Sequence, residues 1–203
     1  LSQNGVAGFI LANGALSGDG TEKEIRKKLI ENKLVEAIAV LPMRMFYTTD
    51  ISVSLWILNR NKKERSVPHG DLTREYRDRE DEVLFMDLRK IGESFEKKFI
   101  QFSDEHIEKI SNTFHTWQQK SFDAEYKDIP EYCYSATIEE IASKDYSLVP
   151  SKYIEFINRD ENIDFDEKMI ALSSDFTELL KAEEKSKQDL LNVFKELGYE
   201  IKL

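Results

Sequence analysis

Short apolar runs separated by glycine or proline fill the first third of the chain and predict the strands of an α/β domain. The runs expected to form strands are residues 8–12, 34–41, 52–58 and 83–86. Residues 8–12 are bounded by glycines, as in a buried parallel strand, and residues 34–41 end at Pro42. Residues 52–58 carry apolar side chains on both faces, which favours a central position in the sheet.

Helical periodicity predicts the remaining regular elements. Capping-box patterns at residues 21–24 and 137–140 predict two helix starts, and Ser103 precedes a third helix with apolar positions three or four residues apart. A long helix is expected over residues 166–197, ended by Gly198. Its middle, AEEKSKQD, is polar on all sides, so its two apolar patches suit two different neighbours or one partner helix. The alternative is an ordinary helix that packs on its own domain.

The connection between the second and third predicted strands contains two adjacent aromatic residues, Phe46 and Tyr47. By spacing alone they can simply cap the edge of the sheet. The functional alternative is a stacking platform, because a base that leaves a duplex loses several kcal/mol and an aromatic face returns roughly 1–3 kcal/mol of it.

The segment after the third predicted strand, residues 60–82, is almost wholly polar and predicts an exposed excursion from the domain. It opens with four cations that could contact phosphates or remain simply solvated: Arg60, Lys62, Lys63 and Arg65.

Composition narrows the possible classes. At 203 residues and 40% hydrophobic content the chain is expected to be globular, with one or two domains. No apolar run approaches the roughly 20 residues needed to span a bilayer, so no membrane association is expected. The single cysteine, Cys133, excludes an internal disulfide framework and predicts a reducing, cytoplasmic location. The net charge of −10 means that any nucleic-acid role must be local or shared with a partner.

Other chemistry is not favoured. Cys133 has no nearby histidine, so a buried structural thiol is expected, and it shares no metal-ligand spacing with the three histidines, His69, His106 and His115. The glycines within residues 14–20 lie between a strand and a helix, where phosphate loops occur. They lack the dinucleotide spacing and the P-loop lysine, which favours a structural loop.

Seven stretches resemble, in chain order, the modification (M) subunit of type I restriction-modification systems, an adenine-N6 DNA methyltransferase that uses S-adenosylmethionine. They are GFILANGALS, IRKKLIENKLVEAIAVLP, MFYTTDISVSLWILNRNK, VLFMDLRKIG, FSDEHIEKISNTFHTWQ, YCYSATIEEIASKDYSLVPSKYI and the terminal EKMIAL…LGYEI. The resemblance covers nearly the whole chain and corresponds to the second half of such a subunit. It implies an α/β fold in which late strands of a Rossmann-like methyltransferase sheet (residues 1–100) precede a mainly α-helical C-terminal region for subunit assembly (residues 101–203).

The resemblance also implies roles for particular residues. In related adenine methyltransferases an aromatic residue in the turn before the last strand stacks on the flipped adenine, and by motif position that residue is Phe46, with Tyr47 beside it. The C-terminal helix is expected to dock on the specificity (S) subunit, and the restriction (R) subunit joins the full complex. A grip on DNA shared with S would reconcile the acidic composition with DNA binding.

Two motifs of the family are missing from this sequence. Its prolines, at positions 42, 68, 130 and 150, are never adjacent, so it has no Asn-Pro-Pro-Tyr/Phe motif to accept the target amine. No Gly-x-Gly donor loop precedes the first strand either. We therefore expect no catalytic residue in this chain. Alone, it should neither methylate DNA nor bind S-adenosylmethionine, whereas the intact enzyme should do both.

The chain begins with leucine, only a few residues before a predicted core strand, which is typical of a piece of a longer protein. The main alternative is a stand-alone interaction module that pairs with a specificity-like subunit and performs no chemistry. A third interpretation is a generic α/β domain without a DNA role.

Overall fold

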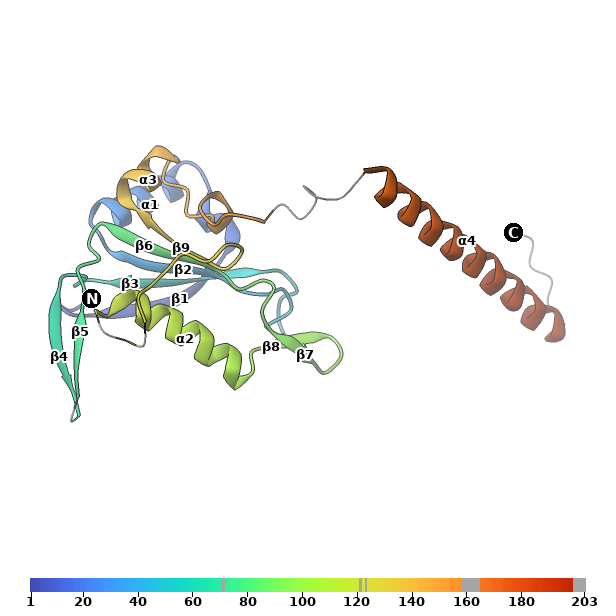
Figure 1. The fold of residues 1–203 in the computed structure, drawn as a ribbon, viewed down its shortest axis with the longest axis horizontal. Coiled ribbons are helices and arrows are strands. Elements are labelled where there is room, and N and C mark those ends of the chain that lie inside the picture. The colour runs from blue at the N-terminus through green and yellow to red at the C-terminus, as the bar shows by residue number, and fades with distance from the viewer. Residues whose placement is uncertain (71, 121, 123, 158–164, 199–203) are drawn as a thin grey trace. The chain divides into compact units, whose positions relative to one another are not determined.

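The chain divides into two compact units, Leu1–Ile157 and Asn158–Leu203, in a computed structural model that describes residues 1–70, 72–120, 122, 124–157 and 165–198. The first unit contains an α/β fold, and the described part of the second is one long helix (Figure 1). No helix within the described ranges is long and apolar enough to cross a membrane.

The first unit is built on one main sheet and two small hairpins. The strands of the main sheet are β1 (Val6–Ala12), β2 (Val35–Val40), β3 (Val53–Asn59), β6 (Glu82–Asp87) and β9 (Cys133–Thr137). The hairpins pair β4 (Arg65–His69) with β5 (Leu72–Tyr76), and β7 (Glu93–Phe95) with β8 (Phe99–Gln101). The helices are α1 (Thr21–Glu31), α2 (Asp104–Gln118), α3 (Ile138–Ser143) and α4 (Phe165–Glu196), with 3-10 turns at Asn13–Leu16 and Pro150–Lys152.

The main sheet is mixed, in the order β1-β3-β2-β6-β9. Strands β2 and β6 pair in parallel, whereas β1 with β3, β3 with β2, and β6 with β9 pair antiparallel. All six residues of β2 are buried, as expected for the central strand of a sheet covered on both faces. The parallel pair brings the carboxyl ends of β2 and β6 to the same end of the sheet.

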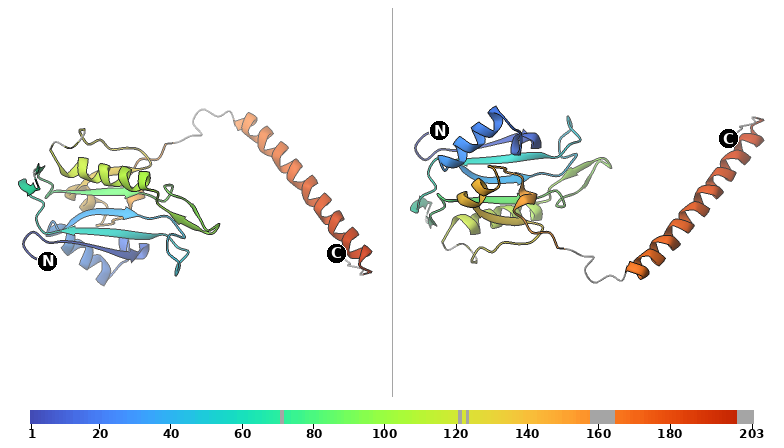
Figure 2. Two further views of the ribbon diagram at one scale, coloured as in Figure 1. Left: turned by 90° about the horizontal axis from the view of Figure 1, so that it is seen from below. Right: turned by 90° about the horizontal axis from the view of Figure 1, so that it is seen from above.

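Helices cover both faces of this sheet. Figures 1 and 2 show α1 and α3 on one face and α2 on the other. Strand β6 illustrates the alternation: Val83 and Phe85 belong to one buried cluster, and Leu84 and Met86 to the other. Trp117 of α2 is completely buried in the second cluster, so α2 is part of the core of this unit.

The prediction of a buried parallel strand at residues 8–12 is wrong. Strand β1 lies at the edge of the sheet, antiparallel to β3, and Val6 and Ile10 remain 57% and 45% exposed. The reason is that β3 occupies the position between β1 and β2. Apolar side chains on an unpaired edge are uncommon in isolated domains. The prediction that residues 52–58 form a central strand is confirmed, since β3 lies between β1 and β2.

All three predicted helix starts are confirmed, two of them with the predicted side-chain cap. Ser103 caps α2 by accepting the His106 backbone N–H, and Thr137 caps α3 by accepting that of Glu140. The capping box predicted at residues 21–24 is wrong, because Thr21 is already helical and Gly20 precedes it without a side-chain cap. The long C-terminal helix is confirmed within one residue at each end, as α4.

Residues beyond the third strand are more ordered than their polarity suggests. Much of the segment 60–82 folds as the β4–β5 hairpin, and Arg79 at its end is 1% exposed. Strand β9 was not expected; it begins at Cys133, whose thiol is buried as predicted. Because β9 completes the sheet, the first compact unit continues to Ile157 and does not end near residue 100. The division into catalytic and assembly parts remains a prediction about roles.

Candidate functional site: an aromatic turn at the carboxyl end of the parallel strands

The turn that connects β2 to β3 lies at the carboxyl end of β2, beside the carboxyl end of β6. The Leu88 backbone N–H donates to the Val40 carbonyl at 2.9 Å, which joins the two strand ends. The Ser52 hydroxyl donates to the Leu41 carbonyl at 2.6 Å and closes the base of the turn. Ligand sites in open α/β sheets lie at this end of the strands, so the position of the turn is that of a binding site.

The two aromatic residues of this turn have different environments. Phe46 is half-buried, packs against the core cluster on the α2 face, and its carbonyl accepts the Thr49 N–H at 3.3 Å. Tyr47 is 72% exposed, and its ring meets the Phe99 ring edge-on at a centroid distance of 4.7 Å. Phe46 therefore has a fixed orientation with part of its ring accessible, and Tyr47 is a solvent-facing ring supported by the β7–β8 hairpin.

The four cations predicted to contact phosphate lie at the other end of the sheet. Strand β3 begins at the aromatic turn and ends at Asn59, so its seven residues place Arg60 about 20 Å away from the turn. Figure 1 shows the β4–β5 hairpin, which follows these cations, at the end of the sheet opposite to β7–β8. Arg60 and Lys63 are exposed, and Arg65 is half-buried over the Tyr76 ring. The structure thus does not bring these cations together with Phe46.

Lys62 is excluded as a surface contact because it is 2% exposed. Its ammonium donates to the carbonyls of Val35 and Glu82 at 2.8 and 2.7 Å. Burial lowers the pKa of Lys62 to about 8, despite the opposing attraction of Glu36. The polar run around it gave no sign of this burial, since the partner carbonyls come from other parts of the chain.

Because the pKa of Lys62 is lowered, the stability of the folded chain should change with pH in the alkaline range. Between about pH 8 and its ordinary value of 10.5 the unfolded chain holds the proton that the folded chain has released. The free energy of unfolding should therefore rise with pH in this window, by at most about 1.4 kcal/mol per pH unit. Denaturant unfolding of the native chain and of Lys62→Met across the window measures the difference. A Lys63→Met variant, altered at an exposed neighbour, should follow the native slope; equal slopes for all three would contradict the prediction.

Near Lys62 lies a buried group of polar side chains. It is centred on Glu36 of β2, whose side chain is fully buried. Its carboxylate accepts two hydrogen bonds from Arg79, at 3.1 and 3.0 Å, one from Gln118 at 3.0 Å and one from Asn59 at 2.6 Å. The donors come from three different parts of the unit, so this network joins β2 to β3, to α2 and to the segment that precedes β6. Its members are satisfied by one another, which indicates a structural role.

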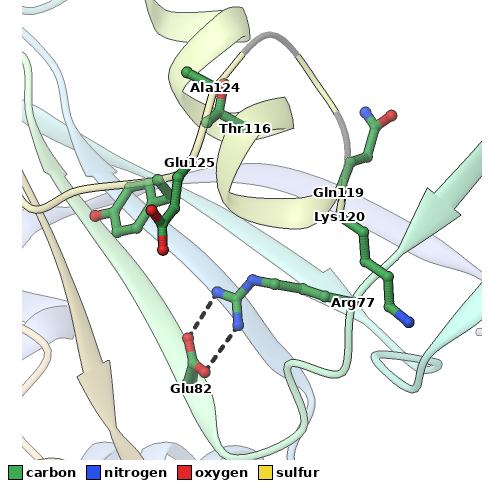
Figure 3. Close-up of a pocket in the computed structure, with 8 residues that line it drawn as sticks. Arg77, Glu82, Thr116, Gln119, Lys120, Ala124 and Glu125 are labelled. Carbon is green, nitrogen blue, oxygen red and sulfur yellow. Dashed lines mark hydrogen bonds and ion pairs between the residues drawn. The ribbon is translucent and has the colours of Figure 1, made fainter.

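A pocket of about 650 Å³ lies near the C-terminal end of α2 (Figure 3). There the carboxylate of Glu82 accepts hydrogen bonds from both terminal nitrogens of Arg77, at 2.9 and 2.7 Å. Although burial acts to raise it, hydrogen bonds from Arg77 and Ser135 hold the pKa of Glu82 below its ordinary value. Glu82 begins β6, so this pocket is at the end of the sheet away from the aromatic turn, and its central charges already pair with each other.

Helix α4 presents an apolar seam, a regular repeat that includes residues of both apolar patches expected from the sequence. Apolar residues recur at intervals of four and three along the helix and just past its end, with two polar interruptions, at positions 183 and 186. They are Phe165, Met169, Leu172, Phe176, Leu179, Leu190, Val193 and Leu197. This is the spacing of a coiled-coil seam. No residue of α4 is buried, and Phe176 and Leu179 are 62% and 67% exposed.

Comparison with known proteins gives consistent matches. Residues 1–162 match the model of the N-6 DNA Methylase family. The chain is 35% identical over 202 residues to the methylase subunit of the type I restriction enzyme HindI of Haemophilus influenzae, covering 98% of this chain and 42% of that subunit. It is 32% identical over 196 residues to the MjaIX methylase subunit of Methanocaldococcus jannaschii, covering 97% of this chain and 33% of that one.

A solved structure agrees with these matches. The methyltransferase subunit of a type I restriction-modification system from Streptococcus thermophilus superposes with a TM-score of 0.59 at 27% identity, over 75% of this chain and 27% of that one. The chain therefore spans less than half the length of the relatives it matches.

Proposed function

Because this chain belongs to the N-6 DNA methylase family, we propose that it is the part of a type I modification subunit that receives the target adenine and joins the subunit to its partners. The observation that carries the proposal is the aromatic turn at the carboxyl end of β2, where Phe46 is held in place by the core and Tyr47 is exposed. In the intact enzyme, β1, β3, β2 and β6 would be late strands of a Rossmann-like methyltransferase sheet.

The glycine loop between β1 and α1 does not suit the methyl donor, S-adenosylmethionine. The Glu22 carboxylate lies against this loop at Gly18, where an added Cβ would be 1.9 Å from it. Glu22 and Glu24 also place negative charge at the N-terminus of α1, where an anionic ligand group would otherwise bind. We therefore assign donor binding and polarisation of the adenine amine to other residues of the intact subunit.

We assign α4 to the interface with the specificity subunit. A helix of 32 residues with an exposed apolar seam gains most of its stability from a partner, because isolated amphipathic helices are only marginally stable in water. A partner that selects the DNA sequence would also supply the positive charge needed to bind DNA, because the net charge of this chain is −10. The restriction subunit would join the assembled complex.

The exposed seam of α4 equally suits the alternative function, a non-catalytic module that pairs with a specificity-like subunit. The two functions differ in the role of Phe46, which only the methyltransferase needs. A module would bind the specificity subunit normally whatever residue replaces Phe46, and would support no base extrusion.

The test uses the full-length subunit assembled with its specificity partner. Phe46→Ala should lower kcat/KM for adenine methylation by roughly 5- to 150-fold, which corresponds to the loss of about 1–3 kcal/mol of base stacking. A fluorescent adenine analogue at the target position should brighten on binding to the native enzyme, because it leaves the stack, and brighten less with the variant.

Two further variants control for turn structure and for the neighbouring ring. Ile51→Ala changes another exposed side chain of the same turn and should leave methylation unchanged. Phe46→Trp keeps an aromatic face and should retain most of the activity. If Phe46→Ala methylates and extrudes the base as the native enzyme does, the stacking role is wrong; a loss confined to Tyr47→Ala would transfer that role to Tyr47.

A further inference from the structure

A second pocket, of about 390 Å³, lies between the start of the aromatic turn and the segment that follows β6. Its lining includes Pro42, Arg44, Arg89, Lys90, Gly92 and Ile100. Both walls leave the sheet at the carboxyl ends of the parallel strands, where α/β sheets place their ligands. Three of its eight lining residues are cations, in a chain whose net charge is −10.

The β7–β8 hairpin and the aromatic turn are fastened together. The Ile100 N–H donates to the Arg44 carbonyl at 3.0 Å, and Tyr47 contacts the Phe99 ring. Gly92 lets the two sides of the hairpin itself approach closely, because a Cβ there would lie 2.6 Å from the Ile100 side chain, and its φ of +123° also favours glycine. The backbone on both sides of the pocket is therefore held together, and it places the cations of the pocket beside the aromatic rings.

Two of the three cations, Arg89 and Arg44, have donors available for a ligand, whereas the Lys90 ammonium pairs with the Glu131 carboxylate at 3.3 Å. Asp87 accepts from Nε and Nη2 of Arg89, at 2.9 and 2.5 Å, whereas Nη1 has no partner in the part of the chain that the structure describes. The Arg44 side chain is exposed and likewise has no partner among the described residues. Its backbone is in the left-handed region, with φ of +59°, which is costly for a residue other than glycine and is held here by the bond from Ile100.

The tip of the hairpin extends this positive surface. Lys97 and Lys98 are exposed, and the Lys98 ammonium lies 5.4 Å from the centre of the Phe99 ring that Tyr47 also contacts. Residues 88–101 contain four cations (Arg89, Lys90, Lys97 and Lys98) and two carboxylates (Glu93 and Glu96), a local excess of +2. The segment 60–82, which has more cations, balances them with an equal number of carboxylates.

A nucleotide that rotates out of a duplex stays attached to its strand through its own phosphates, so cations beside the residue that receives the base face those phosphates. We propose that Arg44, with the cations of the β7–β8 region, binds the DNA phosphates on either side of the target nucleotide. This inference rests on the proposed function of the aromatic turn. It replaces the cations at Arg60–Arg65, which lie at the opposite end of the sheet, as the phosphate contacts that accompany base extrusion.

Salt dependence of DNA binding tests the hairpin cations in the assembled methyltransferase. Removing one cation that binds a phosphate should lower the slope of log Kd against log salt by about 0.9. For the double variant Lys97→Gln/Lys98→Gln we expect a slope lower by about 2 and affinity weakened about tenfold or more at low salt. The matched control, Arg60→Gln/Lys63→Gln, removes the same charge at the far end of β3 and should keep the native slope. An unchanged slope in the hairpin variant, or an equal fall in the control, would overturn the proposal.

Chemical neutralisation of the DNA tests Arg44 itself. Arg44→Asn removes the cation and keeps a residue that tolerates the left-handed backbone. Methylphosphonate linkages flanking the target adenine should weaken native binding severalfold yet add little to Arg44→Asn, since both remove the same interaction. If the two effects simply multiply, Arg44 does not contact those phosphates.

The same series separates this inference from the proposed function. Phe46→Ala is measured alongside with the fluorescent adenine analogue. If Phe46→Ala fails to extrude the base and the hairpin variant keeps the native salt slope, only the phosphate site is overturned. Native extrusion in Phe46→Ala overturns the stacking function, whatever the hairpin variant does.

Discussion

Arg79→Ala is expected to destabilise the chain by roughly 3–5 kcal/mol, the usual cost of leaving one partner of a buried ion pair alone. The Arg79 and Glu36 side chains are 0% and 1% exposed, so water cannot replace the missing donors. The substitution also removes the cation between the Tyr76 and Trp117 rings, at 5.5 and 5.8 Å from their centres. Urea unfolding followed by tryptophan fluorescence measures the change, because Trp117 lies beside the altered residue.

Two variants show whether the destabilisation comes from the buried charge. Lys63→Ala removes an exposed cation and should change the free energy of unfolding by no more than about 0.5 kcal/mol. Glu36→Leu combined with Arg79→Met removes both charges of this ion pair and should be less destabilised than Arg79→Ala. A destabilisation of Arg79→Ala no larger than that of Lys63→Ala would show that the Glu36 network does not hold the unit together.

Placing two carboxylates in the apolar seam of α4 should abolish stable assembly with the specificity subunit. Phe176→Asp/Leu179→Asp changes two adjacent seam positions, and replacing two apolar anchors of an interface in this way should weaken binding about 100-fold or more. Co-elution of the full-length subunit with its specificity partner, followed by titration calorimetry, measures the effect.

The matched control places the same two residues on the opposite face of the same helix. Ser174→Asp/Gln188→Asp adds the same charge at two positions that face away from the seam, because each lies two residues from the nearest seam positions on either side. The variant loses only the weak hydrogen bond from Gln188 to Glu184 and should leave assembly intact. Circular dichroism of both variants shows whether the helix persists. Assembly by the seam variant, or failure of assembly in both variants with the helix still formed, would remove the seam from the interface.

The elements predicted correctly are those whose evidence is local. Residues 52–58 carry apolar side chains on both faces, and β3 is indeed flanked by strands on both sides. Pro42 ends the preceding run and so located the aromatic turn. Ser103 and Thr137 marked helix starts because a cap needs only the next turn of backbone. Each of these signals lies within a few residues of the feature it predicts.

The elements predicted wrongly depend on distant partners. Residues 8–12 have the composition of a buried strand, yet β1 is at the edge because β3 pairs between it and β2. Lys62 sits in a polar run and is nevertheless buried, because its acceptors come from Val35 and Glu82. The aromatic pair could be named from the sequence, but the hairpin that accompanies it could not, since Phe99 follows Tyr47 by more than fifty residues.

The sequence by itself therefore determined the family resemblance, the aromatic turn and the long amphipathic helix, all of which follow from local pattern and order. Only the tertiary structure decided which cations belong to that turn. Two groups of basic residues look alike along the chain, and the antiparallel course of β3 takes Arg60–Arg65 away from Phe46. The parallel pairing of β2 with β6 brings the β7–β8 hairpin to the turn that carries Arg44, because parallel strands end at the same side of a sheet.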